Sequence, residues 1–404
     1  MITAFVLGLS LLILVCFAID IIGDKIKVPS VILLMLIGSI LHYSFNALYI
    51  EEAVQVLPVL GTIALILVVI EAGFDLDYKP EKRPIILKAF FSAFFNLTIC
   101  LIPITLLIQW YYDTDILKAL IHAIPFSIVS SAIAIPSAKS LDANSKEFLT
   151  YETVFSDVFG ILLFNLFITT QVISPSIVFA FTGSLVFSVI LSFTLSMLLV
   201  LMMKHVKHKV RFVPIFAMLV LIYIIGKHFN LPLLITMMIF GLVLNNIEKL
   251  EFPIFHIKLD KRLRVRINHF KRLTHEMTFV IRGLFFVMFG YRLEVIEMLN
   301  PWLVLSVIAL VAFVFTMRYA ILKGLRNKLS GGVIFIAPRG LISILLMLSI
   351  PDMHDIEGFR TEFLDLFIIA TILIQLGMRK YPPEEIFQHK LPQFLSRTLH
   401  GVIK

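Results

Sequence analysis

The sequence predicts an all-α polytopic membrane protein with about 13 transmembrane helices. Of its 404 residues, 59% are hydrophobic and only 15% are charged, and the mean hydropathy is +0.97. Soluble domains have about 45–50% apolar and about 25% charged residues, so we exclude a water-soluble enzyme and expect no enzymatic activity. Each transmembrane helix needs about 20 apolar residues, which leaves no room for a large soluble domain. Both cysteines, Cys16 and Cys100, lie inside apolar runs, so neither a disulfide framework nor a resident cofactor is predicted.

Apolar runs of spanning length divide the chain into two series. The first run has no basic segment before it and no small-residue cleavage site after it, so we interpret it as a transmembrane helix rather than a signal peptide. The expected spans of the first series are 2–22, 29–46, 54–76, 84–112, 115–139, 146–171 and 176–203. Those of the second series are 211–228, 231–247, 272–292, 299–323, 331–351 and 360–378.

The basic residues predict the orientation. Most of the 35 Lys and Arg residues fall in the odd-numbered connections and in a short tail, residues 381–404. Because Lys and Arg concentrate on the cytoplasmic side of membranes, we expect the N-terminus outside and the C-terminus in the cytoplasm of a bacterial inner membrane. The exceptions in even-numbered connections are Lys118, Lys227, Arg292 and Arg360. The net charge of +8 comes from short loops beside the membrane, which favours anionic lipid over nucleic acid as the partner.

A few charged residues lie inside the expected spans, where charges are costly and usually functional. Asp157 lies near the centre of the span 146–171 among apolar neighbours, and it is the first candidate for binding a metal cation or a proton. Thr153 precedes Asp157 by one helical turn and shares its face, whereas Ser156 shares the face of Glu152. The charged residues that we place at bilayer depth are Glu71, Glu152, Asp157, Arg282 and Arg339.

The roles of these charges are open at this point. Asp157 is either an ion-binding carboxylate or one half of a permanent ion pair between helices. For Glu152 we favour a structural ion pair with Arg339. Glu71 either faces water at the cytoplasmic interface or is a second site carboxylate, and the sequence identifies no partner for Arg282. Three acids against two bases leave a formal charge of −1, which one proton or one monovalent cation neutralises. This count predicts electroneutral one-for-one exchange.

Two prolines predict broken helices at matching places. Pro136 and Pro338 would each remove a helix hydrogen bond and free the carbonyls of Ala132 and Ile334. Irregular backbone at membrane depth is tolerated only where it is buried in protein or lines a cavity, although an ordinary proline kink is the alternative. The two spans are seven apart, as expected if spans 1–6 and 8–13 are repeats of inverted topology with broken fifth and twelfth helices.

At these residues the sequence resembles the monovalent cation:proton antiporters of family 1, the branch of archaeal and bacterial sodium/proton antiporters and animal sodium/proton exchangers. The family motif Gly-Glu-Ser-x-x-Asn-Asp matches residues 151–157, Tyr-Glu-Thr-Val-Phe-Ser-Asp. The resemblance implies that Asp157 binds the cation and the proton, that Thr153 is an oxygen ligand and that Glu152 is structural. In the family, the twelfth-span Arg, matched by Arg339, pairs with that Glu. Glu71 resembles a third-span Glu of the family.

The sequence departs from the family pattern at two points. Ser156, which we also count among the candidate ion-binding residues, stands where the family usually has Asn. Ala134-Ile135-Pro136 stands where the family has Thr-Asp-Pro in the fifth span. Ser130 and Ser131 are candidates for substitute oxygen ligands, although small hydroxyl residues also pack helices together.

The resemblance also implies a homodimer with two functional parts in one transmembrane antiporter domain, residues 1–380. Scaffold and dimer helices would cover about 1–76 and 176–292, and a mobile core would cover about 84–171 and 299–378. Alternating movement of the core would exchange sodium or another monovalent cation for protons, in the service of pH homeostasis.

Two competing functions remain at the sequence level. A cation-coupled symporter for an organic anion would use Arg282 to bind a substrate carboxylate. A membrane-embedded enzyme would need a nucleophile or metal motif, and the sequence has neither Gly-x-Ser-x-Gly nor His-Glu-x-x-His. His275 and Glu276, at the cytoplasmic mouth of the tenth span, are candidates for pH sensing because His titrates near neutrality.

Overall fold

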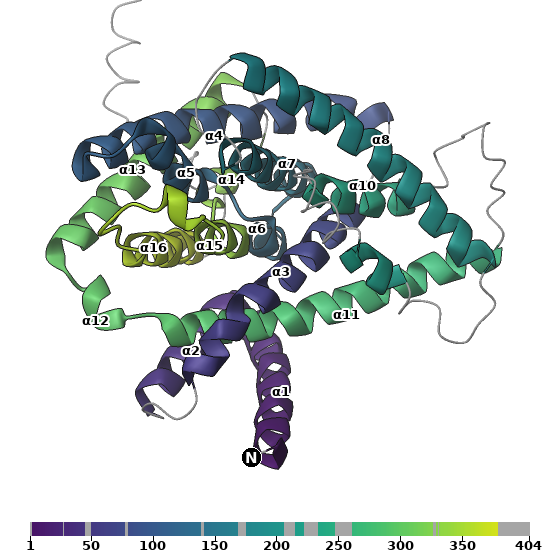
Figure 1. The fold of residues 1–404 in the computed structure, drawn as a ribbon, viewed down its shortest axis with the longest axis horizontal. Helices are drawn as coiled ribbons and strands as arrows, with labels where there is room; N and C mark the ends of the chain where they lie inside the picture. Colours follow the sequence, from purple (N-terminus) through teal and green to yellow (C-terminus); the bar gives the residue numbers. More distant parts are fainter. Residues whose placement is uncertain are drawn as a thin grey trace, which may run out of the picture.

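The computed structural model describes residues 2–26, 28–44, 50–76, 80–138, 141–168, 175–205, 215–221, 233–246, 261–325, 329 and 331–378. All regular structure in these ranges is helical, which confirms the predicted fold class (Figure 1). The expected tail 381–404 and most of the expected span 211–228 lie outside the described residues.

Every other expected span contains a described helix. The first series comprises α1 (Ile2–Ile26), α2 (Ser30–Ser44), α3 (Ile50–Asp75), α4 (Arg83–Tyr112), α5 (Ile116–Ser127), α6 (Ser131–Ser137), α7 (Ala143–Ile168) and α8 (Pro175–His205). The second comprises α10 (Leu233–Asn246), α11 (Lys261–Arg292), α12 (Val295–Met298), α13 (Pro301–Gly324), α14 (Gly332–Phe335), α15 (Leu341–Leu348) and α16 (Glu362–Met378). Helix α11 begins well before the expected residue 272, because its basic first turns continue the helix beyond the apolar run.

Several helices have the length and the surface of membrane-spanning helices. Among the described residues, five segments are long and apolar enough to cross a membrane, namely 83–112, 116–137, 143–168, 263–292 and 301–324. Their outward side chains include the exposed Phe90 and Phe94 of α4. Trp110 and Trp302, at the end of α4 and the start of α13, are also highly exposed, as is typical of tryptophans at a membrane interface.

Both predicted broken helices are present, but the first break lies elsewhere than predicted. Helices α5 and α6 are separated at 128–130, whereas Pro136 lies inside α6 near its end. A proline in the last turn of a short helix disrupts little backbone, so Pro136 does not cause the break. The second break spans 336–340, between α14 and α15, and it contains Pro338 as predicted.

The two broken helices belong to units of opposite direction. Each unit has a long helix, a broken helix and another long helix, α4–α7 and α13–α16. His354 Nε2 lies 3.2 Å from the carbonyl of Ile168, the last residue of α7. Tyr112 at the end of α4 packs against Phe359. Because His354 and Phe359 directly precede α16, this helix begins on the side where α4 and α7 end. For these two units, the arrangement has the inverted topology predicted for the repeats.

The helices pack in two sets. In one set, α2 and α3 cross α11, and α10 packs between α3 and α8, while α1 projects away from α2 and α11 (Figure 1). Two crossings depend on glycine, because a Cβ atom at Gly38 would overlap the α11 backbone and one at Gly73 would overlap the α10 backbone. In the other set, α4 contacts α5, α7 and α13, while α16 contacts α13, α14 and α5.

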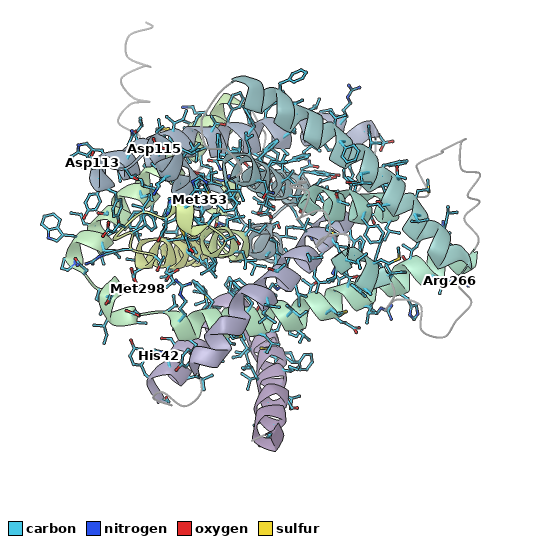
Figure 2. The ribbon with its side chains drawn as sticks, in the orientation of Figure 1. His42, Asp113, Asp115, Arg266, Met298 and Met353 are labelled. Carbon is cyan, nitrogen blue, oxygen red and sulfur yellow. The ribbon has the colours of Figure 1, made fainter. Side chains whose placement is uncertain are left out.

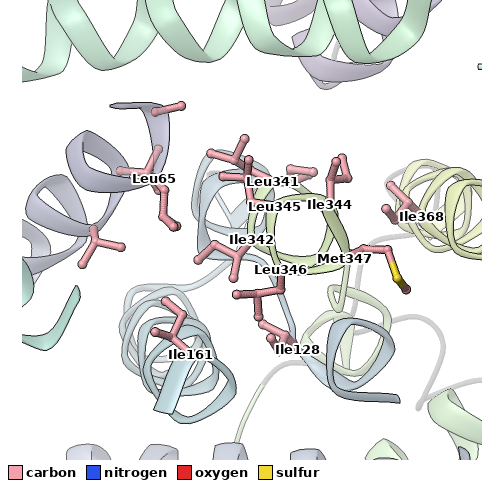
Figure 3. Packing of buried hydrophobic residues seen from close by; sticks show 14 of the residues in the cluster. Leu65, Ile128, Ile161, Leu341, Ile342, Ile344, Leu345, Leu346, Met347 and Ile368 are labelled. Carbon is pink, nitrogen blue, oxygen red and sulfur yellow. The ribbon is translucent and has the colours of Figure 1, made fainter. Parts of the chain in front are cut away.

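The hydrophobic core lies where the two sets meet at α15. Figure 3 shows α15 surrounded by Leu65 of α3, Ile161 of α7, Ile128 of the first break and Ile368 of α16. All four side chains are buried. This packing places both breaks in the protein interior, where their polar backbone needs partners from the protein.

Candidate functional site

The two breaks meet and bond to each other. The N–H of Ser130 donates to the carbonyl of Pro338 at 2.8 Å, which joins the break 128–130 to the break 336–340. Gly340 allows this approach, because a Cβ atom there would lie 2.6 Å from a methyl of Ile133 and 3.0 Å from Ser130 Oγ. The crossing therefore forms a small region of irregular, polar backbone in the middle of the core.

Asp157 of α7 lies beside this crossing and is only 4% exposed. Its Oδ2 accepts a hydrogen bond from the N–H of Ser131 at 3.2 Å, and the Ser131 side chain also contacts the carboxyl group. The other oxygen, Oδ1, is buried and has no hydrogen-bond partner in the described part of the chain, and the same is true of Ser130 Oγ. Asp157 Oδ1 and Ser130 Oγ are thus two buried oxygen atoms that a ligand at the first break could contact.

The two other predicted hydroxyl ligands are already engaged in hydrogen bonds. Ser156 Oγ accepts the N–H of Val129 at 2.9 Å and so fixes the first break to α7. Thr153 Oγ1 donates to the carbonyl of Leu149 at 2.8 Å, one turn earlier on the same helix. Ser156 therefore has a clear structural role, and Thr153 lies on the Asp157 face as predicted.

A pocket reaches Asp157 from the set of helices containing α3 and α10. It is almost entirely apolar, and Asp157 is the one titratable residue in its lining. The lining residues are Val68, Val69, Ala72, Val154, Asp157, Val158, Ile161, Met238 and Ile342. The pocket therefore lies between the two sets of helices, and sliding of one set past the other would alter access to the carboxylate.

The predicted ion pair of Glu152 with Arg339 is wrong. The partner is Arg318 of α13, whose Nη2 lies 2.7 Å from Oε2 and whose Nη1 lies 3.1 Å from Oε1 of Glu152. Ser92 donates to the same carboxylate, and the Arg318 guanidinium also donates to the carbonyl of Val333. Arg318 and Glu152 are each 1% exposed. Glu152 thus has a structural role, as predicted, because its contacts with Ser92 and Arg318 join α4, α7, α13 and α14.

Arg339 instead satisfies the backbone of the breaks. Its Nε donates to the carbonyl of Phe126 at 3.0 Å, its Nη1 donates to that of Ala337 at 2.7 Å, and its guanidinium lies over the ring of Phe367. The carbonyl of Phe126 is at the C-terminal end of α5, where the helix dipole is negative. The N–H of Arg339 donates to Thr371 of α16, as Val129 does to Ser156 in the first unit. Each break is thus held by a hydroxyl from the following helix.

Glu71 contacts α11 in this structure. Its Oε1 is 2.7 Å from Nδ1 of His275 on α11, so the contact links α3 to α11 and involves one of the residues predicted to sense pH. The neighbouring Ala72 lines the pocket, but Glu71 and Arg282 do not. Glu276 is exposed.

Sequence reasoning missed Arg318, Ser92 and Thr371. Arg318 lies inside the expected span 299–323, near the cytoplasmic end that Lys323 marks. Its depth within the apolar run was the available signal, since an Arg that far from the span end needs an acidic partner. Ser92 and Thr371 gave no signal, because hydroxyl residues are common in membrane helices.

Comparisons with known proteins agree with this geometry. The family described as sodium/hydrogen exchanger, transmembrane, matches residues 10–378. A structure of the sodium proton antiporter MjNhaP1 from Methanocaldococcus jannaschii at pH 8 has a TM-score of 0.67 at 17% identity, with 94% of each chain covered. An electron-microscopy structure of the same antiporter has a TM-score of 0.71 at 14% identity, covering 97% of this chain and all of that one.

No curated protein sequence matches the chain. The two structural similarities establish the fold alone, because the identities are low, but the family match covers nearly all of the described helices. By that match the protein is a multi-pass membrane transporter and belongs to the sodium/hydrogen exchanger family.

Proposed function

We propose that the protein exchanges a monovalent cation, sodium in the first place, for protons, and that both ions compete for Asp157. The observation that carries this proposal is the buried carboxylate itself. Among the described residues its Oδ1 has no donor, while its Oδ2 accepts the N–H of Ser131, whose side chain also contacts the carboxyl group. Bare carboxylate charge in a protein interior is strongly unfavourable. The group therefore requires a bound proton or a bound cation in the occluded state, and it can carry only one of them.

Ser130 and Ser131 are the proposed additional cation ligands. Ser130 Oγ is buried without a hydrogen-bond partner among the described residues, and Ser131 contacts the Asp157 carboxyl group. Oxygen ligands of this kind suit hard cations. Thr153 and Glu71 are proposed to act nearby, Thr153 on the Asp157 face of α7 and Glu71 at the cytoplasmic approach.

Exchange is proposed to be electroneutral. This proposal rests on the charges close to Asp157 in place of the charge count over all spans. Arg318 adds a third base within the spans, so the predicted formal charge of −1 for the intramembrane residues is wrong. Glu152 is neutralised by Arg318, however, and no carboxylate occurs between Asp115 and Asp142 to supply a second site acid at the first break. One sodium ion or one proton then gives the site the same charge.

Transport is proposed to proceed by alternating access in a homodimer of the bacterial inner membrane, with the N-terminus outside and the C-terminus in the cytoplasm. The helices around the two breaks would form the moving core, about residues 84–171 and 299–378, and the scaffold would cover about 1–76 and 176–292. The pocket at Asp157 supports this division because both sets of helices line it. Such exchange would contribute to pH homeostasis.

The test uses proteoliposomes with an imposed pH gradient and a clamped membrane voltage. Addition of sodium, lithium or potassium should collapse the gradient at a rate that is independent of voltage, whereas choline should not. Asp157→Asn should abolish the response. Asp365→Asn, which changes a buried carboxylate of α16 outside the pocket, is the matched control and should retain it.

The apparent KM for sodium should rise as the pH falls. Because protons and cations compete, lowering the pH on the cation-loading side should raise the apparent KM for sodium by up to about tenfold per pH unit, with the maximal rate retained. A pH-independent KM would contradict competition at one site. If no alkali cation acts on the gradient at all, the antiport proposal fails and the organic-anion symporter becomes the hypothesis to test.

A further inference from the structure

A short segment ties together the ends of two helices that form the ion site. This segment, residues 350–361 between α15 and α16, is called the strap. Lys118 of α5 donates through Nζ to the carbonyl of Asp355 at 2.9 Å, and His354 Nε2 lies 3.2 Å from the carbonyl of Ile168, the last residue of α7. Figure 2 labels Met353 of the strap and Asp115 at the start of α5 on the same side of the molecule. In the proposed orientation this side is the outer face.

The strap is folded over His122 of α5. Gly358 turns the chain with a φ of 75°, a conformation that favours glycine. The ring of the following residue, Phe359, has its centroid 4.6 Å from that of His122 and 5.4 Å from that of Tyr112. The His122 side chain is 2% exposed, whereas the Asp355 side chain beside it is 72% exposed. A buried imidazole therefore lies directly under a carboxylate that is open to water.

The hydrogen bonds of His122 assign its neutral tautomer. Nδ1 lies 2.9 Å from the carbonyl of Lys118, and a carbonyl only accepts, so Nδ1 carries the hydrogen. Nε2 of the neutral ring then bears a lone pair, and it lies 3.9 Å from Asp355 Oδ1. Two acceptors facing each other at this distance form no hydrogen bond. A proton on Nε2 would convert them into a donor and an acceptor of opposite charge.

Several groups act on a proton at His122. Burial of the ring opposes protonation most strongly, and the positive charges of Lys118 and His354 oppose it as well. The carbonyl of Lys118 and the carboxylate of Asp355 favour it. Lys118 directs its ammonium group to the Asp355 carbonyl. The Asp355 carboxylate faces Nε2 itself, so it lies closest to where the proton would bind.

We propose that His122 Nε2 and Asp355 form a second proton-binding site, separate from Asp157, which tightens the strap on α5 when the outer face is acidified. The strap holds the ends of α5 and α7, so its tightening would restrain the helices that carry the ion site. External protons would then slow exchange beyond their competition at Asp157. This effect on transport rests on the proposed function, whereas the binding of the proton does not.

Hydrogen–deuterium exchange of the purified protein tests the site without any transport measurement. After correction for the intrinsic pH dependence of exchange, protection of peptides covering 350–361 should rise about two- to fivefold from pH 8 to pH 5, the range for a partly exposed ion pair. Asp355→Asn should remove this rise, and His122→Gln should do the same. Asp355 is the safer substitution because its side chain is exposed.

Two further variants separate this site from others. His269→Gln changes an exposed histidine of α11 and should leave the pH-dependent protection intact, as should Asp157→Asn. The proposal is overturned if wild-type protection is independent of pH, if the rise survives Asp355→Asn, or if it disappears in Asp157→Asn. In proteoliposomes, Asp355→Asn should shift inhibition by external acid to lower pH. An unchanged inhibition curve would overturn the link to transport, and failure of Asp157→Asn to abolish exchange would overturn the proposed function instead.

Discussion

At the scale of single residues, the site depends on which polar groups are already satisfied. Ser156 accepts the Val129 N–H, Arg318 neutralises Glu152, and Asp157 retains a buried oxygen without a partner in the described chain. An unsatisfied buried polar group costs free energy, so Asp157 gains most from a ligand. This distinction separates the structural residues of α7 from Asp157, the residue that we propose to bind the ions.

Ser156 provides a test of this assignment. Ser156→Ala leaves the buried N–H of Val129 without its acceptor, which should destabilise the protein by about 1–3 kcal/mol. Ser156→Asn, which introduces the residue that the antiporter family usually has, still offers a carbonyl acceptor and should retain more stability and exchange. Thermal unfolding in detergent and transport in proteoliposomes measure both effects. Equal stability of the wild type and the Ala variant would contradict the structural role.

The Glu152–Arg318 pair gives a second prediction at this scale. Removing one partner of a buried pair leaves an uncompensated charge, so Arg318→Met should destabilise the protein by about 3–5 kcal/mol. The double variant Glu152→Gln/Arg318→Met removes both charges and should recover much of the loss, as measured by thermal unfolding. Arg339→Met combined with Glu152→Gln is the matched control and should show no such recovery, because Arg339 bonds to backbone carbonyls.

At the scale of helices, close crossings fix the frame against which the broken helices are placed. Gly73 of α3 and Gly241 of α10 each lie against the backbone of the other helix, and both helices contribute residues to the pocket at Asp157. The position of the apolar pocket wall therefore depends on how closely α3 and α10 approach.

Enlarging this crossing should damage both stability and transport. Gly73→Ala places a Cβ atom against the backbone carbonyl of Met238, which cannot move without shifting α10, and overpacking of this kind costs about 1–3 kcal/mol. Gly8→Ala on α1, where a Cβ atom meets nothing within 4 Å, is the control and should have no effect. Thermal unfolding and sodium-driven proton flux report the result. Identical behaviour of the two variants would show that the crossing tolerates separation.

At the scale of the whole molecule, the pocket joins two packed sets of helices. Ala72 and Met238 belong to the set of α3 and α10, whereas Val154 and Ile342 belong to the set around the breaks. Interfaces between packed bodies can slide or rotate without disturbing the interior of either body. Movement between these sets would open Asp157 to one side of the membrane or the other.

Cross-linking tests this movement. In a background with Cys16 and Cys100 replaced by Ala, a flexible bifunctional thiol reagent joining Ala72→Cys to Val154→Cys should stop exchange. A matched pair within one set, Ser192→Cys and Thr236→Cys, replaces two hydroxyls 2.9 Å apart, and its disulfide should leave exchange intact. If that disulfide does slow exchange, its reduction should restore the rate. Full exchange with Ala72 joined to Val154 would rule out relative movement at the pocket.

The sequence by itself determined the membrane class and the positions of most helices, and it selected Asp157 as the carboxylate proposed to bind the ions. These follow from hydropathy, helical periodicity and the cost of burying charge, which are local properties of the chain. Periodicity also placed Thr153 on the Asp157 face. The second break was correctly located at Pro338, because a proline there has no backbone N–H to donate.

Only the tertiary structure decided which groups meet. Glu152 and its partner are far apart in sequence, and a long guanidinium reaches whichever acid the helix crossings bring near, so Arg318 rather than Arg339 is the partner. The first break lies at 128–130 because Ser156 and the carbonyl of Pro338 accept the N–H groups of Val129 and Ser130, and Asp157 accepts that of the adjacent Ser131. The nearby prolines, Pro125 and Pro136, both lie inside the flanking helices and do not mark the break. Pairings across helices depend on packing geometry, which one helix's periodicity does not contain.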